Sequence, residues 1–272
     1  MNAEQKVTTG RADLHIHTLA SDGVSSVAQI LEHAEAAGLD LIAITDHERV
    51  DAAHAAHAMA EARGMRVKVI VGEEISTRGG HVLALFIEKR IRPWGSLRSA
   101  VAQVHEQGGL AIVAHPLVPY PLTCASGRSI RRLLDDPDPD VHPDGIEAFN
   151  PTTAGTRWGA RVPQFVADVG VAALGNSDAH RAEDVGQAFT TFEGASAADL
   201  RRAIEARTTS WQGSKYTWPG QFATFRSQMG KRATAVRDDL RGVVLRDGTG
   251  RDLGYPGGRQ RPTRLRADEV QR

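Results

Sequence analysis

Two patterns of hydrophobic and polar positions alternate along the chain from residue 12 to residue 212. Short apolar runs, each closed by polar or turn-forming residues, predict buried strands. Between them, apolar residues recur at helical spacing, and several of these stretches stop at glycines. We therefore expect strands at residues 12–18, 39–47, 65–76, 81–87, 110–116, 143–151 and 171–180, and helices at residues 26–38, 51–64, 97–109 and 161–170. Residues 186–192 and 197–207 complete the regular part.

This repeated alternation predicts a parallel α/β fold in which helices surround an apolar sheet. Seven or so strands suit a closed or distorted (β/α) barrel better than an open doubly wound sheet, and no glycine-rich dinucleotide loop follows the first strand. The pattern degrades after residue 213. We expect a barrel domain over residues 1–212, a partly helical extension over residues 213–243, and a disordered tail over the glycine-, proline- and arginine-rich residues 244–272.

Composition narrows the class of protein. The formal net charge is zero, so no general attraction to nucleic acid or membrane is expected. From Lys231 onward, eleven Lys/Arg stand against six Asp/Glu, which makes the tail basic, and we interpret it as a solvated tail. The single cysteine, Cys124, excludes an internal disulfide and fits a reducing compartment. With no apolar leader and no run long enough to cross a bilayer, the sequence predicts a cytoplasmic protein.

Reactive side chains gather at the ends of the predicted strands. In a barrel of parallel strands all carboxyl ends lie at one face, where active sites are built. Imidazoles and carboxylates that converge there predict a metal site. Six of the eleven histidines stand at strand ends or in adjoining turns, namely His15, His17, His47, His81, His115 and His180. The accompanying carboxylates are Asp22, Asp46, Glu73, Glu74 and Asp178.

The two-residue period of a strand adds detail to this site. Successive side chains point to opposite sides, so His15 and His17 share one side and can chelate together. Asp178 and His180 repeat this spacing. The same alternation allows only one of the neighbouring glutamates at positions 73 and 74 to face the site, and periodicity alone does not say which.

In this order, the motifs "HIH…D", "TDH", "GEEIS", "HVLAL", "AHP" and "SDAH" resemble the polymerase-and-histidinol-phosphatase (PHP) family of metal-dependent phosphoesterases. The resemblance covers residues 12–206. In detail, "DLHIHTLASDG" and "ITDHERVDAAHAA" resemble the stand-alone members that act on nucleotides and short oligonucleotides. The resemblance implies a distorted seven-stranded barrel that carries two or three divalent metal ions.

The resemblance also implies nine metal ligands. The family's glutamate stands two residues after the glycine, which selects Glu74 over Glu73. The first metal would be held by His15, His17, Glu74 and Asp178. A bridging Glu74, with His81 and His115, would hold the second metal, and Asp22, His47 and His180 would form a third site.

Ligands of this kind, without thiolates, suit Mn, Zn or Fe. Two such ions about 3.5–4 Å apart can share a hydroxide and clamp the attacking and leaving oxygens of an in-line displacement. If only two ions bind, His180 or Asp22 is available as a general acid for the leaving group. Arg49 and Arg181 lie just beyond ligand positions, and Arg78 lies in a turn; each is a candidate for binding phosphate oxygens.

The sequence therefore favours a hydrolase that cleaves a phosphomonoester or short phosphodiester of a small, nucleotide-type substrate through a metal-bridging hydroxide. A small-metabolite phosphatase of the histidinol-phosphate type and a non-enzymatic metal-binding module remain alternatives, although the presence of all nine ligand types favours catalysis. The segment between His115 and Asp178 has its own proline-rich loop, whereas the nucleotide-acting relatives usually carry a longer insertion. Few aromatic and basic residues precede residue 213, so we expect no stacking platform for long nucleic acid.

Overall fold

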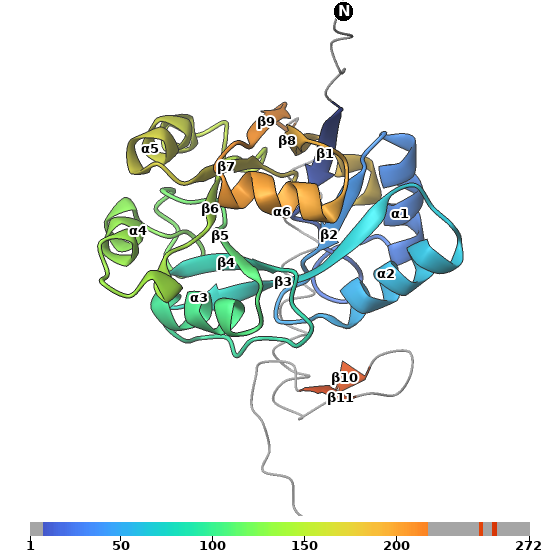
Figure 1. Cartoon of the computed structure of the whole chain (residues 1–272), viewed down its shortest axis with the longest axis horizontal. Coiled ribbons are helices and arrows are strands. Elements are labelled where there is room, and N and C mark those ends of the chain that lie inside the picture. The colour runs from blue at the N-terminus through green and yellow to red at the C-terminus, as the bar shows by residue number, and fades with distance from the viewer. Residues whose placement is uncertain (1–7, 217–244, 247–251, 255–272) are drawn as a thin grey trace, which may run out of the picture.

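One mixed sheet curls into a nearly closed barrel, as Figure 1 shows for this computed structural model. The structure describes residues 8–216, 245–246 and 252–254. The strands follow the order β7-β6-β5-β4-β3-β2-β1-β8-β9. Their bounds are β1 Thr9–Asp13, β2 Leu41–Ile44, β3 Lys68–Thr77, β4 Gly80–Leu85, β5 Leu110–Val113, β6 Gly145–Phe149, β7 Ala172–Gly175, β8 Ala188–Glu193 and β9 Ser210–Gly213.

Hydrogen bonds from threonine side chains join the two ends of the sheet. The Thr190 hydroxyl on β8 accepts from the Gly175 N–H of β7 and donates to the Gly175 carbonyl, at 3.1 and 3.0 Å. Thr209, just before β9, donates to the Ala173 carbonyl at 2.8 Å. The expected distorted α/β barrel is therefore confirmed.

Four of the strand pairings depart from the expected parallel arrangement. β4 runs antiparallel to both β3 and β5, and β8 runs antiparallel to both β1 and β9. The β3–β4 connection consists of Arg78 and Gly79, which is too short for the crossover that a parallel pair needs. Gly80 begins β4 with φ +119°, and a Cβ there would lie 2.3 Å from the Ala125 nitrogen. The turn therefore requires glycine at this position.

Helices occupy the segments between most strands, and their bounds are α1 Val27–Ala36, α2 Asp51–Ala62, α3 Leu97–Glu106, α4 Gly127–Leu134, α5 Val162–Val169 and α6 Ala197–Glu205. Short 3-10 turns lie at Pro139–Val141, Gly159–Arg161 and Ala182–Asp184. The sequence did not predict α4 or β9. Both are short, and α4 follows a proline-rich stretch that hides the helical spacing; its start is marked by Ser126, which accepts from the Ser129 N–H.

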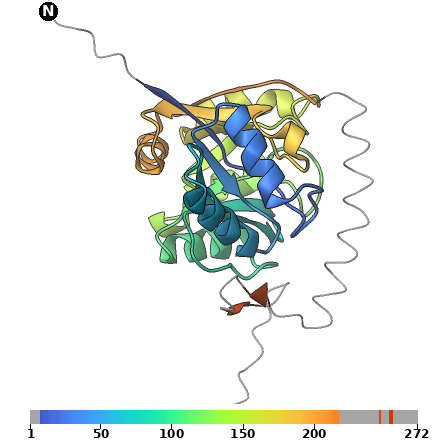
Figure 2. The same cartoon turned by 90° about the vertical axis from the view of Figure 1, so that its right-hand side faces the viewer.

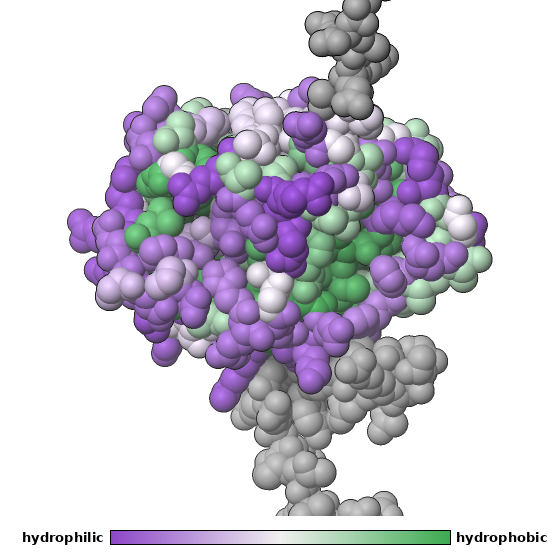
Figure 3. Space-filling model, viewed as in Figure 1, coloured by the Kyte–Doolittle hydropathy of each residue, from purple (hydrophilic) through white to green (hydrophobic). Residues whose placement is uncertain are grey.

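Three hydrophobic clusters hold the layers together. One fills the barrel, with residues from seven strands and from α6, which lies across the front of the barrel in Figure 1. A second packs α3, α4 and α5 against the outer side of the sheet. The third lies under α1 and α2, which run side by side on one flank (Figure 2). On the face in Figure 3 the surface is mostly hydrophilic, with hydrophobic patches between the helices.

The chain still contacts the barrel after β9. The Tyr216 hydroxyl donates to the Ser177 carbonyl at 2.6 Å. Further on, the structure describes two short strands, β10 Leu245–Arg246 and β11 Asp252–Gly254, which pair antiparallel. The helix expected within residues 213–243 and the disorder expected over most of residues 244–272 lie outside the described residues. Of the residues that are described, none belongs to a helix long and apolar enough to cross a membrane.

Candidate metal centre

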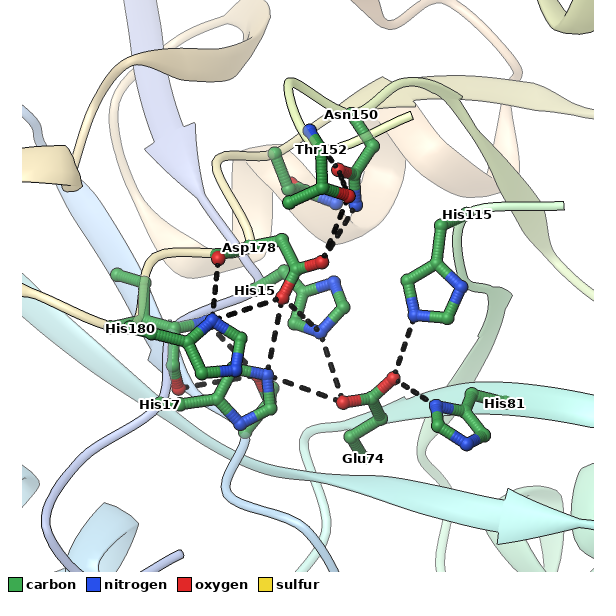
Figure 4. Close-up of polar contacts among 12 residues, drawn as sticks. His15, His17, Glu74, His81, His115, Asn150, Thr152, Asp178 and His180 are labelled. Carbon is green, nitrogen blue, oxygen red and sulfur yellow. Dashed lines mark hydrogen bonds and ion pairs between the residues drawn. The ribbon is translucent and has the colours of Figure 1, made fainter. Parts of the chain in front are cut away.

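All nine side chains that the sequence marked as ligands meet at one end of the barrel. Figure 4 shows the part of this cluster formed by His15, His17, Glu74, His81, His115, Asp178 and His180. The nine side chains come from the carboxyl ends of β1, β2, β3, β5 and β7, from the loop after β1, and from the start of β4. Because β4 is antiparallel, its first residues reach the end of the barrel where its neighbours finish. The nine are His15, His17, Asp22, His47, Glu74, His81, His115, Asp178 and His180.

Glu74 lies at the centre of this cluster, and its two oxygens face different histidines. Oε1 lies 2.6 Å from His81 Nδ1 and 3.0 Å from His115 Nε2. Oε2 lies 3.2 Å from both His15 Nε2 and His17 Nε2, and 3.3 Å from His47 Nδ1. A carboxylate shared in this way is suited to bridging two cations.

The strand period explains why Glu74, and not Glu73, is at the centre. Ile70 on the same strand belongs to the barrel interior, and Ile75 belongs to the outer cluster. Alternation therefore sends Glu74 inward and Glu73 outward. Glu73 is buried on the outer side, where its Oε1 accepts from the Ile91 N–H at 2.8 Å.

Two further carboxylates complete the cluster. Asp178 Oδ1 lies 3.5 Å from His15 Nε2, 3.4 Å from His17 Nε2 and 3.6 Å from His180 Nδ1. Asp22 Oδ1 lies 3.4 Å from His17 Nδ1 and 3.3 Å from His180 Nε2. His17 thus contacts all three carboxylates, since its Nε2 also faces Glu74.

Asp22 reaches His47 with its other oxygen, which lies 3.6 Å from His47 Nε2. His180 stacks on His17 with ring centroids 4.2 Å apart. The resemblance implied a third site formed by Asp22, His47 and His180. Both histidines lie next to Asp22, and His17 lies beside them.

Two of these residues need unusual backbone to reach the site. Ala111 and Val113 of β5 belong to the outer cluster, so strict alternation would direct His115 outward as well. His115 has φ +26°, and Asp178 has φ +54°, both in the left-handed region that costs free energy for residues with a Cβ. Such strain concentrates at functional sites.

The donor set fits divalent cations. Five buried imidazole nitrogens make no hydrogen bond, although carboxylate oxygens lie nearby: His15 Nε2, both nitrogens of His17, His47 Nδ1 and His180 Nε2. Buried polar atoms normally have a hydrogen-bond partner. Four triads of ligand atoms, each spanning no more than 4.8 Å, are present among the described residues. Nitrogen and oxygen atoms in this mixture are typical ligands of Mn, Zn and Fe.

The charges of the cluster perturb its pKa values strongly. Burial alone would raise the pKa of Glu74, but His47, His15 and His81 outweigh it and hold the pKa well below its usual range. Burial alone would lower the pKa of His17, but Asp22 and the other carboxylates raise it to about 10. His17 and the carboxylates around it thus stabilise each other in ionised form, and a cation must displace the proton of His17 to bind its nitrogen atoms.

A buried glutamate that the sequence reasoning missed, Glu147 on β6, supports the cluster from behind. Its Oε1 accepts from His15 Nδ1 at 2.8 Å and from Asn176 Nδ2 at 2.9 Å. Its Oε2 accepts from the His115 N–H at 2.7 Å and from Asn150 Nδ2 at 3.1 Å. A carboxylate behind a ligand histidine fixes the tautomer and the orientation of its ring. The sequence feature that could have identified Glu147 is its position as a charged residue inside the apolar run "GIEAF".

Asp46 holds the loop that carries Asp22. Its carboxylate accepts from the N–H and hydroxyl of Thr18, at 2.8 and 2.7 Å, and from the N–H and hydroxyl of Ser21. Gly23 follows, and a Cβ there would lie 2.4 Å from the His17 carbonyl oxygen. The "TDH" motif therefore contributes one residue to the cluster, His47, and one to the architecture of the neighbouring loop.

The three candidate arginines differ in their partners. Arg49 forms two hydrogen bonds to Asp51, at 2.7 and 2.9 Å, and Arg181 forms two to Asp184, at 2.8 and 3.0 Å. Arg78 is exposed in the β3–β4 turn and forms no ion pair within the described part of the chain. The role of Arg49 and Arg181 in binding phosphate stays a prediction, and local carboxylates already compete for both.

Comparison with known proteins agrees with the geometry. The family model described as PHP domain matches residues 13–115, and the one described as PHP-associated matches residues 158–209. Over 151 residues the chain is 33% identical to the uncharacterized protein MJ1587 of Methanocaldococcus jannaschii, covering 52% of this chain and 81% of that protein. Over 85 residues it is 36% identical to the 5'-3' exoribonuclease of Haemophilus influenzae, covering 30% of each.

The fold has a counterpart among solved structures. A two-domain protein from Bacteroides vulgatus, described as containing a predicted PHP-like metal-dependent phosphoesterase, matches 84% of this chain and 71% of its own with a TM-score of 0.59 and 20% identity. The family models match the N-terminal and the C-terminal part of the barrel sequence. The ordered motifs and the shared fold agree with these matches. The chain belongs to the PHP domain family.

Proposed function

We propose that this protein is a metal-dependent phosphoesterase that hydrolyses a phosphomonoester or short phosphodiester of a nucleotide-type substrate. The observation that carries the proposal is the convergence of six histidines on three carboxylates, with Glu74 shared between two groups of imidazoles. The membership in a family that includes metal-dependent phosphoesterases supports it.

The first cation would be held by His15, His17 and Asp178, with one oxygen of Glu74. The second would be held by the other oxygen of Glu74 and by His81 and His115. Divalent ions at these positions supply Lewis-acid stabilisation of the charge that develops on the phosphoryl and leaving oxygens. Mn, Zn and Fe are the candidate ions, and Asp22, His47 and His180 would form a third site.

When that third site is empty, His180 is the group we assign to protonating the leaving oxygen. Its Nδ1 hydrogen-bonds to the Asp178 carbonyl at 2.9 Å, which leaves Nε2 facing Asp22 at 3.3 Å. Asp22 thus orients the ring of His180. Asp22 itself is less suited to donate a proton, because its carboxylate lies between three imidazoles that favour its ionised form.

The nucleotide-type substrate is the finer part of the proposal. It is supported by the resemblance to the exoribonuclease of Haemophilus influenzae, which covers 85 residues, 30% of this chain. The arginines near the cluster offer contacts for phosphate oxygens, with Arg78 the most available.

A histidine substitution tests the assignment. We expect His17→Ala to abolish phosphate release, because His17 contacts all three carboxylates of the cluster. The matched control is His54→Ala on α2, whose ring hydrogen-bonds to the Glu88 carbonyl at 2.9 Å. The measurements are metal content by elemental analysis and phosphate release from nucleotides, nucleoside bisphosphates and sugar phosphates with Mn or Zn present.

Undiminished activity and metal content in His17→Ala would contradict the assignment of the cluster. Metal bound by the wild-type protein without phosphate release from any ester would instead favour a non-enzymatic metal-binding module. Preference for a small non-nucleotide ester would favour the metabolite phosphatase.

A further inference from the structure

Large hydrophobic side chains are exposed at only five positions of the described barrel, and all five lie in loops. Leu19 and Val24 flank Asp22 in the β1–α1 loop. The other three are Trp94, which is 55% exposed in the β4–α3 loop, and Tyr120 and Leu122, which are 57% and 53% exposed in the β5–α4 loop. Exposed hydrophobic residues grouped in this way mark a binding surface.

The β5–α4 loop is fixed directly to two of the proposed ligands. The Tyr120 carbonyl accepts from the Thr123 and Cys124 N–H groups at 3.3 and 3.0 Å, which closes a tight turn. The Thr123 carbonyl accepts from the His81 N–H at 3.0 Å. Cys124 Sγ lies 3.6 Å from His115 Nδ1. The turn that carries Tyr120 is therefore adjacent to the second proposed cation position.

The β4–α3 loop lies on the other side of the β3–β4 turn. The Trp94 N–H donates to the Ser76 carbonyl at 2.7 Å, and Ser76 pairs with His81 across the hairpin. The Arg78 N–H donates to the Gly95 carbonyl at 2.9 Å. The turn that carries Arg78 thus lies between the Trp94 loop and the loop of residues 120–125, which packs against Gly80.

Two of the five exposed hydrophobic residues also have a strained backbone. Trp94 has φ +63° and Leu122 has φ +67°, a region that bulky side chains rarely adopt. A positive φ costs free energy at these two positions, and both side chains are largely exposed. Packing of the two side chains within the chain therefore does not explain the strained backbone.

We propose that Trp94 and Tyr120 bind the base of the nucleotide substrate by stacking, and that Arg78 between them binds phosphate oxygens. This rests on the proposed function and assigns the residues that set its specificity. Aromatic side chains stack on every base, and a guanidinium in a turn offers forked donors to a phosphate. Two aromatic rings on neighbouring loops are enough for a single nucleotide or the end of a short oligonucleotide.

Two esters that differ only in the base test the proposal. Adenosine 5'-monophosphate and ribose 5-phosphate carry the same phosphomonoester, and kcat/KM is measured for both. For Tyr120→Ala and Trp94→Ala, we expect a loss of about tenfold with the nucleotide and less than a twofold change with ribose 5-phosphate. Tyr120→Phe keeps the ring and restores the nucleotide rate. Arg78→Gln lowers the rate with both esters.

His54→Ala is the control, because the His54 ring lies on α2 and hydrogen-bonds to the Glu88 carbonyl at 2.9 Å. Its ratio of the two rates stays at the wild-type value. Equal losses with both esters in Tyr120→Ala and Trp94→Ala, or no loss with either, would overturn the proposal. If the wild-type protein hydrolyses neither of these two esters, the proposed function is decided by the wider screen of phosphate esters described above. Saturation-transfer NMR with adenosine then decides the base site separately: transfer to adenine protons that disappears in both alanine variants supports it, and unchanged or absent transfer overturns it.

Discussion

Replacing Glu147 with glutamine removes one of the two acceptor oxygens behind His15 and His115. The two oxygens of Glu147 receive four N–H donors, from His15 Nδ1 and Asn176 on one side and from the His115 backbone and Asn150 on the other. A glutamine side chain of the same shape offers one oxygen and one amide NH2. Whichever way the amide is turned, its NH2 group faces two donors, and those donors lose their acceptor.

The size of the effect follows from the burial of this network. Each buried donor left without a partner costs about 1–3 kcal/mol. Two such donors should lower the free energy of unfolding of the metal-free protein by about 2 kcal/mol or more. Because His15 would no longer be held by a carboxylate, the affinity for the first cation should fall by about 10–100-fold.

The control for Glu147→Gln is Glu73→Gln, which changes another buried glutamate, the neighbour of Glu74. Burial raises the pKa of Glu73 to about 8, so its carboxyl group is mainly protonated at neutral pH. Glutamine then reproduces the neutral side chain and keeps an oxygen for the Ile91 N–H. At pH 7 we expect Glu73→Gln to leave both the unfolding free energy and the metal affinity near their wild-type values.

The assays are urea unfolding of the metal-free proteins and metal titration in competition with a chelator of known affinity. If Glu147→Gln binds the cations as tightly as the wild-type protein and unfolds at the same urea concentration, the Glu147 carboxylate does not have the orienting role assigned to it. Equal losses in both glutamine variants would also refute this role, because they would assign the effect to burial of any glutamate and not to the four donors.

Two further predictions concern pH and metal removal. The hydrogen bond to Asp144, at 2.9 Å, raises the pKa of His105 above its ordinary 6.5. The stability from this pair is therefore fully present below about pH 6.5 and lost as the pH rises through the raised pKa. Comparing the urea unfolding of His105→Gln and wild type should show a difference that is largest near pH 5.5 and smaller near pH 8.5; a difference that grows with pH would contradict the assigned direction. Removing metal from the wild-type protein with a chelator should lower its Tm, because cations bind the folded state preferentially, while His17→Ala should show a smaller shift; an identical shift in both proteins would indicate that the cluster does not hold the metal.

The sequence by itself determined the elements that local patterns encode. Apolar runs of strand length and amphipathic stretches with glycine stops located seven of the nine barrel strands and four of the six helices. Histidines two residues apart, as at His15 and His17, showed which side chains share a side. The positions of the ligands at strand ends followed from the rule that parallel strands finish at one face.

The tertiary structure decided what depends on contacts between distant segments. Glu147 stands 132 residues from His15, and no local pattern links the two. His115 points inward with a left-handed backbone, φ +26°, whereas the alternation of β5 would have predicted an outward side chain. Alternation left Glu73 and Glu74 equivalent until the interior of the barrel was known. Residue type and spacing thus set the candidates for this site, whereas the packing of the closed barrel set their orientation, their partners and their charge.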